Sequence, residues 1–151
     1  MKARKLVTWA CCVILAAVFA LAAVPKLIDP GNFANDLLNY RLLPESLVGL
    51  FALFVPALEL VIAAALLWPR YQRGAALLST VLLVGFAAAM AQARIRGIDL
   101  SCGCFGAAFE SKVSWLTVAR SMLLAAVSAV PLFLVPLSAA AARTARGERP
   151  A

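Results

Sequence analysis

Histidine is missing from the 151-residue chain, and charged residues make up only 14% of it. Without histidine there is no imidazole to act as a general base, to complete a zinc site or to ligate haem. Only four cysteines are present, which, with two of them in the first apolar segment, is too few for an iron–sulfur cluster. An average soluble domain is about one quarter charged. The composition therefore excludes a soluble globular domain.

Hydrophobic residues make up 64% of the chain, and its net charge is +7. A strongly basic chain can bind nucleic acid, but here the basic residues are scattered and lie beside long apolar segments. Lys and Arg in that position normally set the orientation of membrane helices. We therefore expect no nucleic-acid partner and expect the chain to lie in a lipid bilayer.

Four apolar stretches are long enough to cross a bilayer as helices, which takes about 20 residues each. They cover residues 6–24, 47–68, 74–93 and 113–137. These stretches predict an all-α integral membrane protein, with one four-helix domain over residues 1–142 and a basic cytoplasmic tail over 143–151. The first stretch also resembles a secretory signal peptide, but its length favours a retained helix.

The basic residues are unevenly divided between the two sides of this predicted bundle. If the N-terminus is cytoplasmic, that side carries eight: Lys2, Arg4, Lys5, Arg70, Arg73, Arg143, Arg146 and Arg149. The opposite side carries five: Lys26, Arg41, Arg94, Arg96 and Lys112. Because Lys and Arg concentrate in cytoplasmic loops, we expect a multi-pass protein of the plasma membrane with both termini in the cytoplasm.

The element Cys102-Gly-Cys104-Phe-Gly106 occupies the predicted extracytoplasmic loop between the third and fourth stretches. Disulfides form and persist on that side of the membrane. A bridge between cysteines two residues apart closes a very small ring, and Gly103 allows the required bend at little steric cost. A strained bridge has a high reduction potential and is readily passed on. The element therefore predicts dithiol–disulfide cycling at Cys102 and Cys104.

Two other roles of this loop stay open. One is a structural disulfide that pins the loop. The other is a metal site completed by a second copy of the chain, although two thiolates supply only half of a usual zinc set, and we expect no metal. Cys11 and Cys12 lie in the first stretch, where we expect small core residues rather than partners of Cys102 and Cys104.

Two ionisable residues lie inside predicted helices. Glu59 is midway along the second helix, and Arg120 is about two turns into the fourth. Charges at such depth are costly and usually face the bundle interior or a partner. The two residues predict either an interhelical ion pair that locks the bundle, or a polar pocket beneath the cysteine loop for a redox carrier or a proton.

The first outer loop, residues 25–45, has apolar side chains at helical spacing between Pro30-Gly31 and Pro44. This pattern predicts a short amphipathic helix on the membrane surface, capped by Asn32 or Gly31. Such a helix is either a lid over the outer end of the bundle or a gate beside the cysteine loop.

Other residues stand in a set order around the cysteine element. They are Lys26-Leu27, Phe33, Tyr40, Pro44, Pro56, Glu59-Leu60, Arg96-Gly97, Trp115 and Arg120. This order, with the cysteine element as its most specific part, resembles the MauE/DoxX family of redox-associated integral membrane proteins. The resemblance runs from Leu6 to about Leu137.

The resemblance implies an up-down four-helix bundle, related in architecture to the vitamin K epoxide reductase-like disulfide-forming proteins. MauE members support maturation of the disulfide-rich small subunit of methylamine dehydrogenase, and DoxX relatives are linked to quinone-coupled sulfur oxidation. On this basis Cys102 and Cys104 are the expected catalytic residues, and quinone is the suggested electron carrier. The expected supporting or pocket residues are Lys26, Glu59, Gly103 and Arg120.

Three functions follow from these observations. The first is a quinone-linked thiol–disulfide oxidoreductase that acts on an exported thioredoxin-like or disulfide-containing protein. The second is a non-catalytic assembly subunit in which Cys102 and Cys104 are structural. The third is a small-molecule carrier that uses Glu59 and Arg120. The paired thiols favour the first of these.

Overall fold

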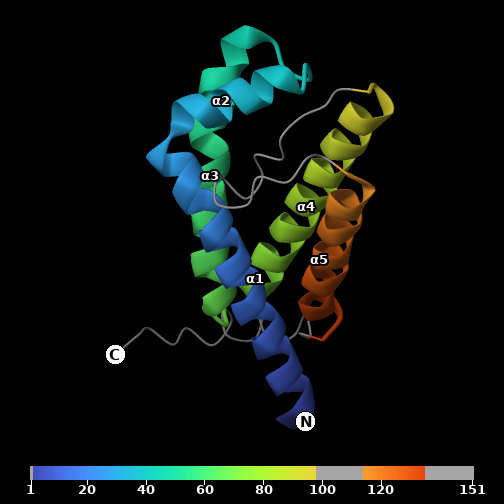
Figure 1. Ribbon diagram of the computed structural model, residues 1–151. Helices are drawn as coiled ribbons and strands as arrows, with labels where there is room; N and C mark the ends of the chain where they lie inside the picture. The colour runs from blue at the N-terminus through green and yellow to red at the C-terminus, as the bar shows by residue number, and fades with distance from the viewer. Residues whose placement is uncertain (1, 98–113, 135–151) are drawn as a thin grey trace.

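The computed structural model describes residues 2–97 and 114–134. In these ranges the long helices are α1 (Lys2–Ile28), α3 (Glu45–Leu67), α4 (Gln72–Ile95) and α5 (Trp115–Leu134), and α2 (Pro30–Asn39) is a short one (Figure 1). All four long helices are apolar and long enough to cross a membrane. The predicted all-α, four-helix membrane fold is confirmed. The predicted tail, residues 143–151, lies outside the described residues.

Successive long helices run in opposite directions, as expected for an up-down bundle (Figure 1). We call the end at which α1 begins the N-terminal end, and the end that carries α2 the α2 end. The α3–α4 turn lies at the N-terminal end. α4 ends at the α2 end, and α5 begins on that side of the bundle and runs back (Figure 1).

The helix α1 is longer than the predicted stretch, which stops at residue 24. It passes through Pro25 and ends at Ile28. Pro25 has no N–H to donate, but its carbonyl oxygen accepts a hydrogen bond from the Asp29 N–H at 3.0 Å. Proline is tolerated inside membrane helices, because neighbouring groups re-satisfy the backbone carbonyl that it leaves free. As a result Lys26, which we expected in the outer loop, lies within α1.

Two helix pairs build the bundle, because α1 packs mainly against α3 and α4 packs mainly against α5. In the first pair Leu15 and Phe19 of α1 share the main core cluster with Ile62 and Leu66 of α3. Cys12 belongs to the same buried cluster, which confirms its expected role as a small core residue.

The α4–α5 pair is built on small and hydroxylated residues. Ser79 and Ser128 are fully buried, and Ala76 and Ala125 lie in the same core. Small residues let two membrane helices approach closely. The hydroxyl oxygens of Thr80 and Ser128 are 2.6 Å apart and share a hydrogen bond between the two helices.

The expected short helix in the first outer loop is present as α2. Its N-cap is Asp29, whose side chain accepts a hydrogen bond from the Asn32 N–H at 2.9 Å. The predicted caps, Asn32 and Gly31, are therefore wrong, since the helix begins one residue before Gly31, at Pro30. Phe33 is buried against Ala52 and Val55 of α3, so α2 is held by the bundle as well as by its own amphipathic character.

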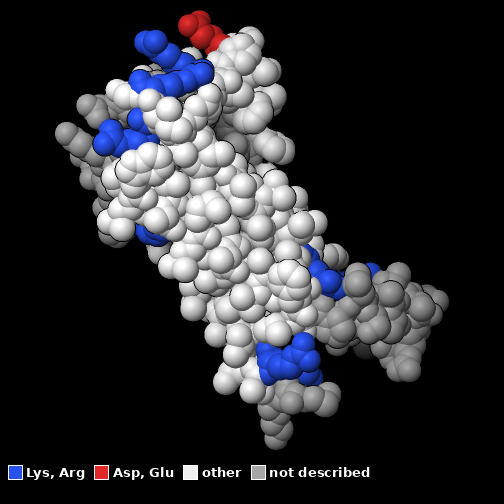
Figure 2. All heavy atoms as spheres, turned by 90° about the vertical axis from the view of Figure 1, so that its right-hand side faces the viewer, with Lys and Arg blue, Asp and Glu red and all other residues white. Residues whose placement is uncertain are grey.

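The side surface of the molecule is apolar. Figure 2 shows Lys and Arg side chains mainly toward the two ends of the molecule, with a broad band between them that is almost free of charge. Large apolar side chains of the four long helices, such as Leu21, Leu53, Val81 and Leu123, are more than half exposed. An exposed band of this kind suits contact with lipid chains.

Candidate functional site

The predicted redox element, which contains Cys102, Gly103 and Cys104, lies outside the described residues. The structure does describe both flanks of the segment that holds it. α4 ends at Ile95, with Gly97 in a left-handed conformation just beyond it, and α5 begins at Trp115. Both flanks lie on the α2 side of the bundle (Figure 1).

The most unusual site in the described part of the chain is a buried ion pair between α1 and α3. The ammonium nitrogen of Lys26 lies 2.6 Å from Oε1 of Glu59, and each side chain is only 1% exposed. Removing two charges from water is expensive, and the cost is offset only by close pairing and further polar contacts. Lys26 and Glu59 are therefore mutually dependent.

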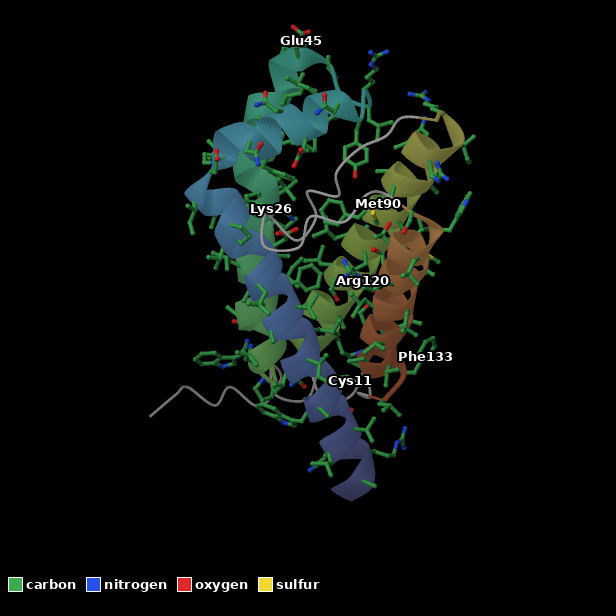
Figure 3. All side chains as sticks on the ribbon, in the orientation of Figure 1. Cys11, Lys26, Glu45, Met90, Arg120 and Phe133 are labelled. Carbon is green, nitrogen blue, oxygen red and sulfur yellow. The ribbon has the colours of Figure 1, made fainter. Side chains whose placement is uncertain are left out.

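Two aromatic rings complete the surroundings of Lys26. Its ammonium nitrogen lies 5.0 Å from the ring centroid of Phe33 on α2 and 5.2 Å from that of Phe86 on α4. A cation within about 6 Å of an aromatic face is attracted by the ring's quadrupole. One ammonium group thus contacts side chains from α2, α3 and α4 while belonging to α1 (Figure 3).

The carboxylate of Glu59 is only half satisfied. Its Oε1 accepts the hydrogen bond from Lys26, while Oε2 is buried and has no hydrogen-bond partner among the described residues. Buried polar atoms usually have a partner. Oε2 can therefore accept a hydrogen bond from a hydroxyl or N–H group that enters the bundle, and this makes the ion pair a candidate binding site.

Arg120 is not the ionic partner of Glu59, contrary to one of our two expectations for that pair. It is an exposed residue of α5. Figure 3 places it across the bundle from Lys26 and nearer the N-terminal end. The difference arises because α1 extends past Pro25 and brings Lys26 into the bundle at the level of Glu59.

The structure thus brings together two of the predicted pocket residues, Lys26 and Glu59. Phe86 was missed, because a phenylalanine inside an apolar stretch gives no signal that distinguishes a cation contact from ordinary core packing. Among the residues that the structure describes, no group of three metal-ligating side chains occurs. Lys26, Glu59, Phe33 and Phe86 together form a buried ion pair whose ammonium group is flanked by two aromatic rings.

Comparison with known proteins identifies the family. A family model described as methylamine utilisation protein MauE matches residues 4–134. The chain is 35% identical to methylamine utilization protein MauE of Paracoccus denitrificans over 126 residues, which cover 83% of this chain and 68% of that protein. It is 39% identical to the MauE protein of Methylorubrum extorquens over 128 residues, covering 84% and 69% of the two chains.

A third relative, the MauE protein of Paracoccus versutus, is 37% identical over 134 residues, which cover 88% of this chain and 72% of that protein. No solved structure matches the chain. The matched region includes all of α2 to α5 and nearly all of α1. The chain therefore belongs to the family of methylamine utilisation protein MauE.

Proposed function

We propose that this membrane protein catalyses thiol–disulfide exchange on the extracytoplasmic face and supports disulfide formation in an exported protein of methylamine oxidation. The relatives are named for methylamine utilisation, and the family resemblance implies a methylamine dehydrogenase-type subunit as the substrate. The observation that carries the proposal is the Cys-Gly-Cys element in the α4–α5 connection. Its two flanks lie on the α2 side of the bundle, and Lys26, near the end of α1, lies toward the same side.

The exchange step uses the Cys102–Cys104 disulfide as the oxidant. A thiolate of the exported protein attacks one of the two sulfurs and forms a mixed disulfide, which releases the other as a thiolate. A second thiolate of the exported protein then attacks the mixed disulfide. The products are a disulfide in the exported protein and a reduced Cys102–Cys104 pair, which has gained two electrons and two protons.

Reoxidation of that pair requires an acceptor, and we propose a membrane quinone. The reduced pair gives two electrons and two protons to the quinone, which leaves as quinol while the disulfide re-forms. Lys26 and Glu59 support this assignment, because both side chains are buried and the Lys26 ammonium also contacts the rings of Phe33 and Phe86. Oε2 of Glu59 is buried and has no hydrogen-bond partner among the described residues, and in this proposal it accepts a hydrogen bond from a quinol hydroxyl.

The orientation belongs to the proposal. We place the N-terminal end in the cytoplasm and the α2 end outside, following the distribution of Lys and Arg along the whole chain. A membrane-impermeant thiol reagent, applied to intact cells after mild reduction, should then label Cys102 and Cys104. Labelling that appears only after permeabilisation would reverse the orientation.

The test compares three single variants in cells that make an exported substrate with a disulfide. Cys102→Ser and Cys104→Ser should each leave the substrate's thiols reduced, whereas the control Cys11→Ser should leave its oxidation unchanged. Alkylation of free thiols followed by mass spectrometry measures the outcome. Normal substrate oxidation in both loop variants, at wild-type protein levels, would instead support a non-catalytic assembly role. A fourth variant, Glu59→Gln, tests the third function: loss of substrate oxidation in this variant but in neither loop variant would support a small-molecule carrier.

A further inference from the structure

A groove runs along the outside of the bundle where α3 and α4 meet at the N-terminal end. Its volume is about 670 Å³, within the range of about 300–1,000 Å³ that ligand pockets usually have. Its walls include Ala65 of α3 with Gly74 and Leu78 of α4, and its end is formed by Trp68, Arg70 and Tyr71.

The groove exists because small residues face each other where the two helices join. α3 packs mainly against α1, and α4 packs mainly against α5. Few side chains therefore fill the seam between α3 and α4. A side chain added at Gly74 would meet no atom within 4 Å at its Cβ, so the glycine leaves open space. Val61 and Leu78 line the groove and are 62% and 50% exposed.

Hydrocarbon is the natural occupant of this space, because both helices are membrane spans and the lining is almost entirely apolar. The mouth has a different character. Trp68 and Tyr71 are 66% and 56% exposed there, and such aromatic side chains prefer the boundary between lipid chains and headgroups. Arg70 beside them carries a guanidinium group, whose planar set of donors suits a phosphate.

The charge of this end favours an anion. Arg4, Lys5, Arg70 and Arg73 belong to the N-terminal end of the bundle. Three acidic residues within the described ranges lie at the α2 end, Asp29, Asp36 and Glu45, whereas Glu59 is buried inside the bundle and paired with Lys26. Arg73 already donates a hydrogen bond to the Leu132 carbonyl oxygen at 2.9 Å, so Arg70 is the basic residue at the mouth itself.

We propose that this groove binds one acyl chain of an anionic phospholipid, whose phosphate contacts Arg70. The lipid comes from the leaflet at the N-terminal end, and its chain fills the seam that Gly74 leaves open. The site is separate from Lys26 and Glu59 and does not depend on the proposed thiol chemistry. The bound acyl chain stabilises the α3–α4 turn, because it covers apolar surface that no other described helix of the bundle covers.

The test uses the full chain in nanodiscs made of equal amounts of phosphatidylglycerol and phosphatidylcholine with identical acyl chains. After release into detergent, native mass spectrometry should show one retained lipid per chain, with phosphatidylglycerol preferred. Arg70→Gln should reduce that preference about fivefold, as expected for the loss of one basic contact. Arg94→Gln, which removes an exposed arginine at the other end of α4, should leave the preference unchanged.

A second pair of variants tests the groove itself. Gly74→Leu fills the seam and should abolish lipid retention, whereas Gly85→Leu, at an exposed glycine of the same helix with equal free space, should not. Circular dichroism confirms that each variant is folded. Three results would overturn the proposal: equal retention of both lipids by the wild type, full retention by Gly74→Leu, or a dimer that Gly74→Leu dissociates. The last would show that a second copy occupies the groove.

Discussion

Lys26 and Glu59 are separated by 33 positions in the sequence, yet their charged atoms lie 2.6 Å apart in the interior of the bundle. Neither charge can be solvated by bulk water, since each side chain is only 1% exposed. The pair therefore behaves as a unit, and its members respond very differently to single and double substitution.

Breaking the pair should cost more than removing it. Glu59→Gln or Lys26→Met alone leaves a buried charge without its counter-charge, which typically destabilises a protein by about 3–5 kcal/mol. The double variant Lys26→Met/Glu59→Leu should recover most of that loss, because an apolar pair replaces both charges. Denaturant titration in detergent micelles measures the free energies of unfolding. Additive losses in the double variant would show that the two residues are not coupled.

The ring of Phe86 should stabilise the fold through Lys26. Phe86→Leu is expected to lower the free energy of unfolding by about 0.5–2 kcal/mol beyond the cost of lost packing. Packing and cation contact are separated by repeating the substitution in the Lys26→Met background, where only the packing loss should remain. Phe54→Leu is the control, since Phe54 is 57% exposed on α3. The same loss in both backgrounds would remove the cation contact from the explanation.

The hydrogen bond between Thr80 and Ser128 should hold α4 against α5. Thr80→Val removes it with little change of shape, and the expected loss of stability is about 0.6 kcal/mol, with an upper limit near 1.7 kcal/mol. Thr8→Val is the matched control, because the Thr8 hydroxyl donates only within its own helix, to the Arg4 carbonyl oxygen. An equal effect in both variants would mean that the interhelical contact adds nothing.

Asp36 on α2 should make stability depend on pH. Burial raises the pKa of its carboxyl group, so the folded protein binds this proton more tightly than the unfolded chain does. Its contribution to stability is therefore largest at acidic pH, declines as the pH rises from the ordinary carboxyl pKa through the raised one, and stays low above it. Asp36→Asn should flatten this part of the profile and stabilise the protein at neutral pH. A profile that the substitution leaves unchanged would contradict the assignment, and Glu45→Gln, at an exposed site, provides the comparison.

Most of the fold could be predicted because long apolar runs determine which segments become membrane helices. The four stretches and the short outer helix follow from such local signals, and the up-down order was implied by the family resemblance. The end of α1 was harder, since Pro25 suggested a boundary and only the structure shows that Asp29 continues the hydrogen bonding. The cap at Asp29 was missed for the same reason.

The partner of Glu59 could not be predicted from local patterns. Which residues of two antiparallel helices lie at the same level depends on how Leu15 and Phe19 pack against Ile62 and Leu66 along their whole length. A charged residue inside a membrane helix predicts a partner, but the sequence does not indicate which helix carries that partner. Lys26 entered the predicted pocket through family resemblance alone, whereas Arg120 was chosen both for its depth in the helix and for that resemblance.

The span between Lys26 and Glu59 also bears on how the chain enters the membrane. When α1 first leaves the ribosome, the counter-charge of Lys26 has not yet been synthesised, because α3 begins at Glu45. Lys26 lies near the end of α1, where a long side chain can reach the lipid headgroups in the meantime. Because Lys26 gains its counter-charge only when α3 arrives, we expect α1 and α3 to complete their integration together as a pair of helices rather than one after the other.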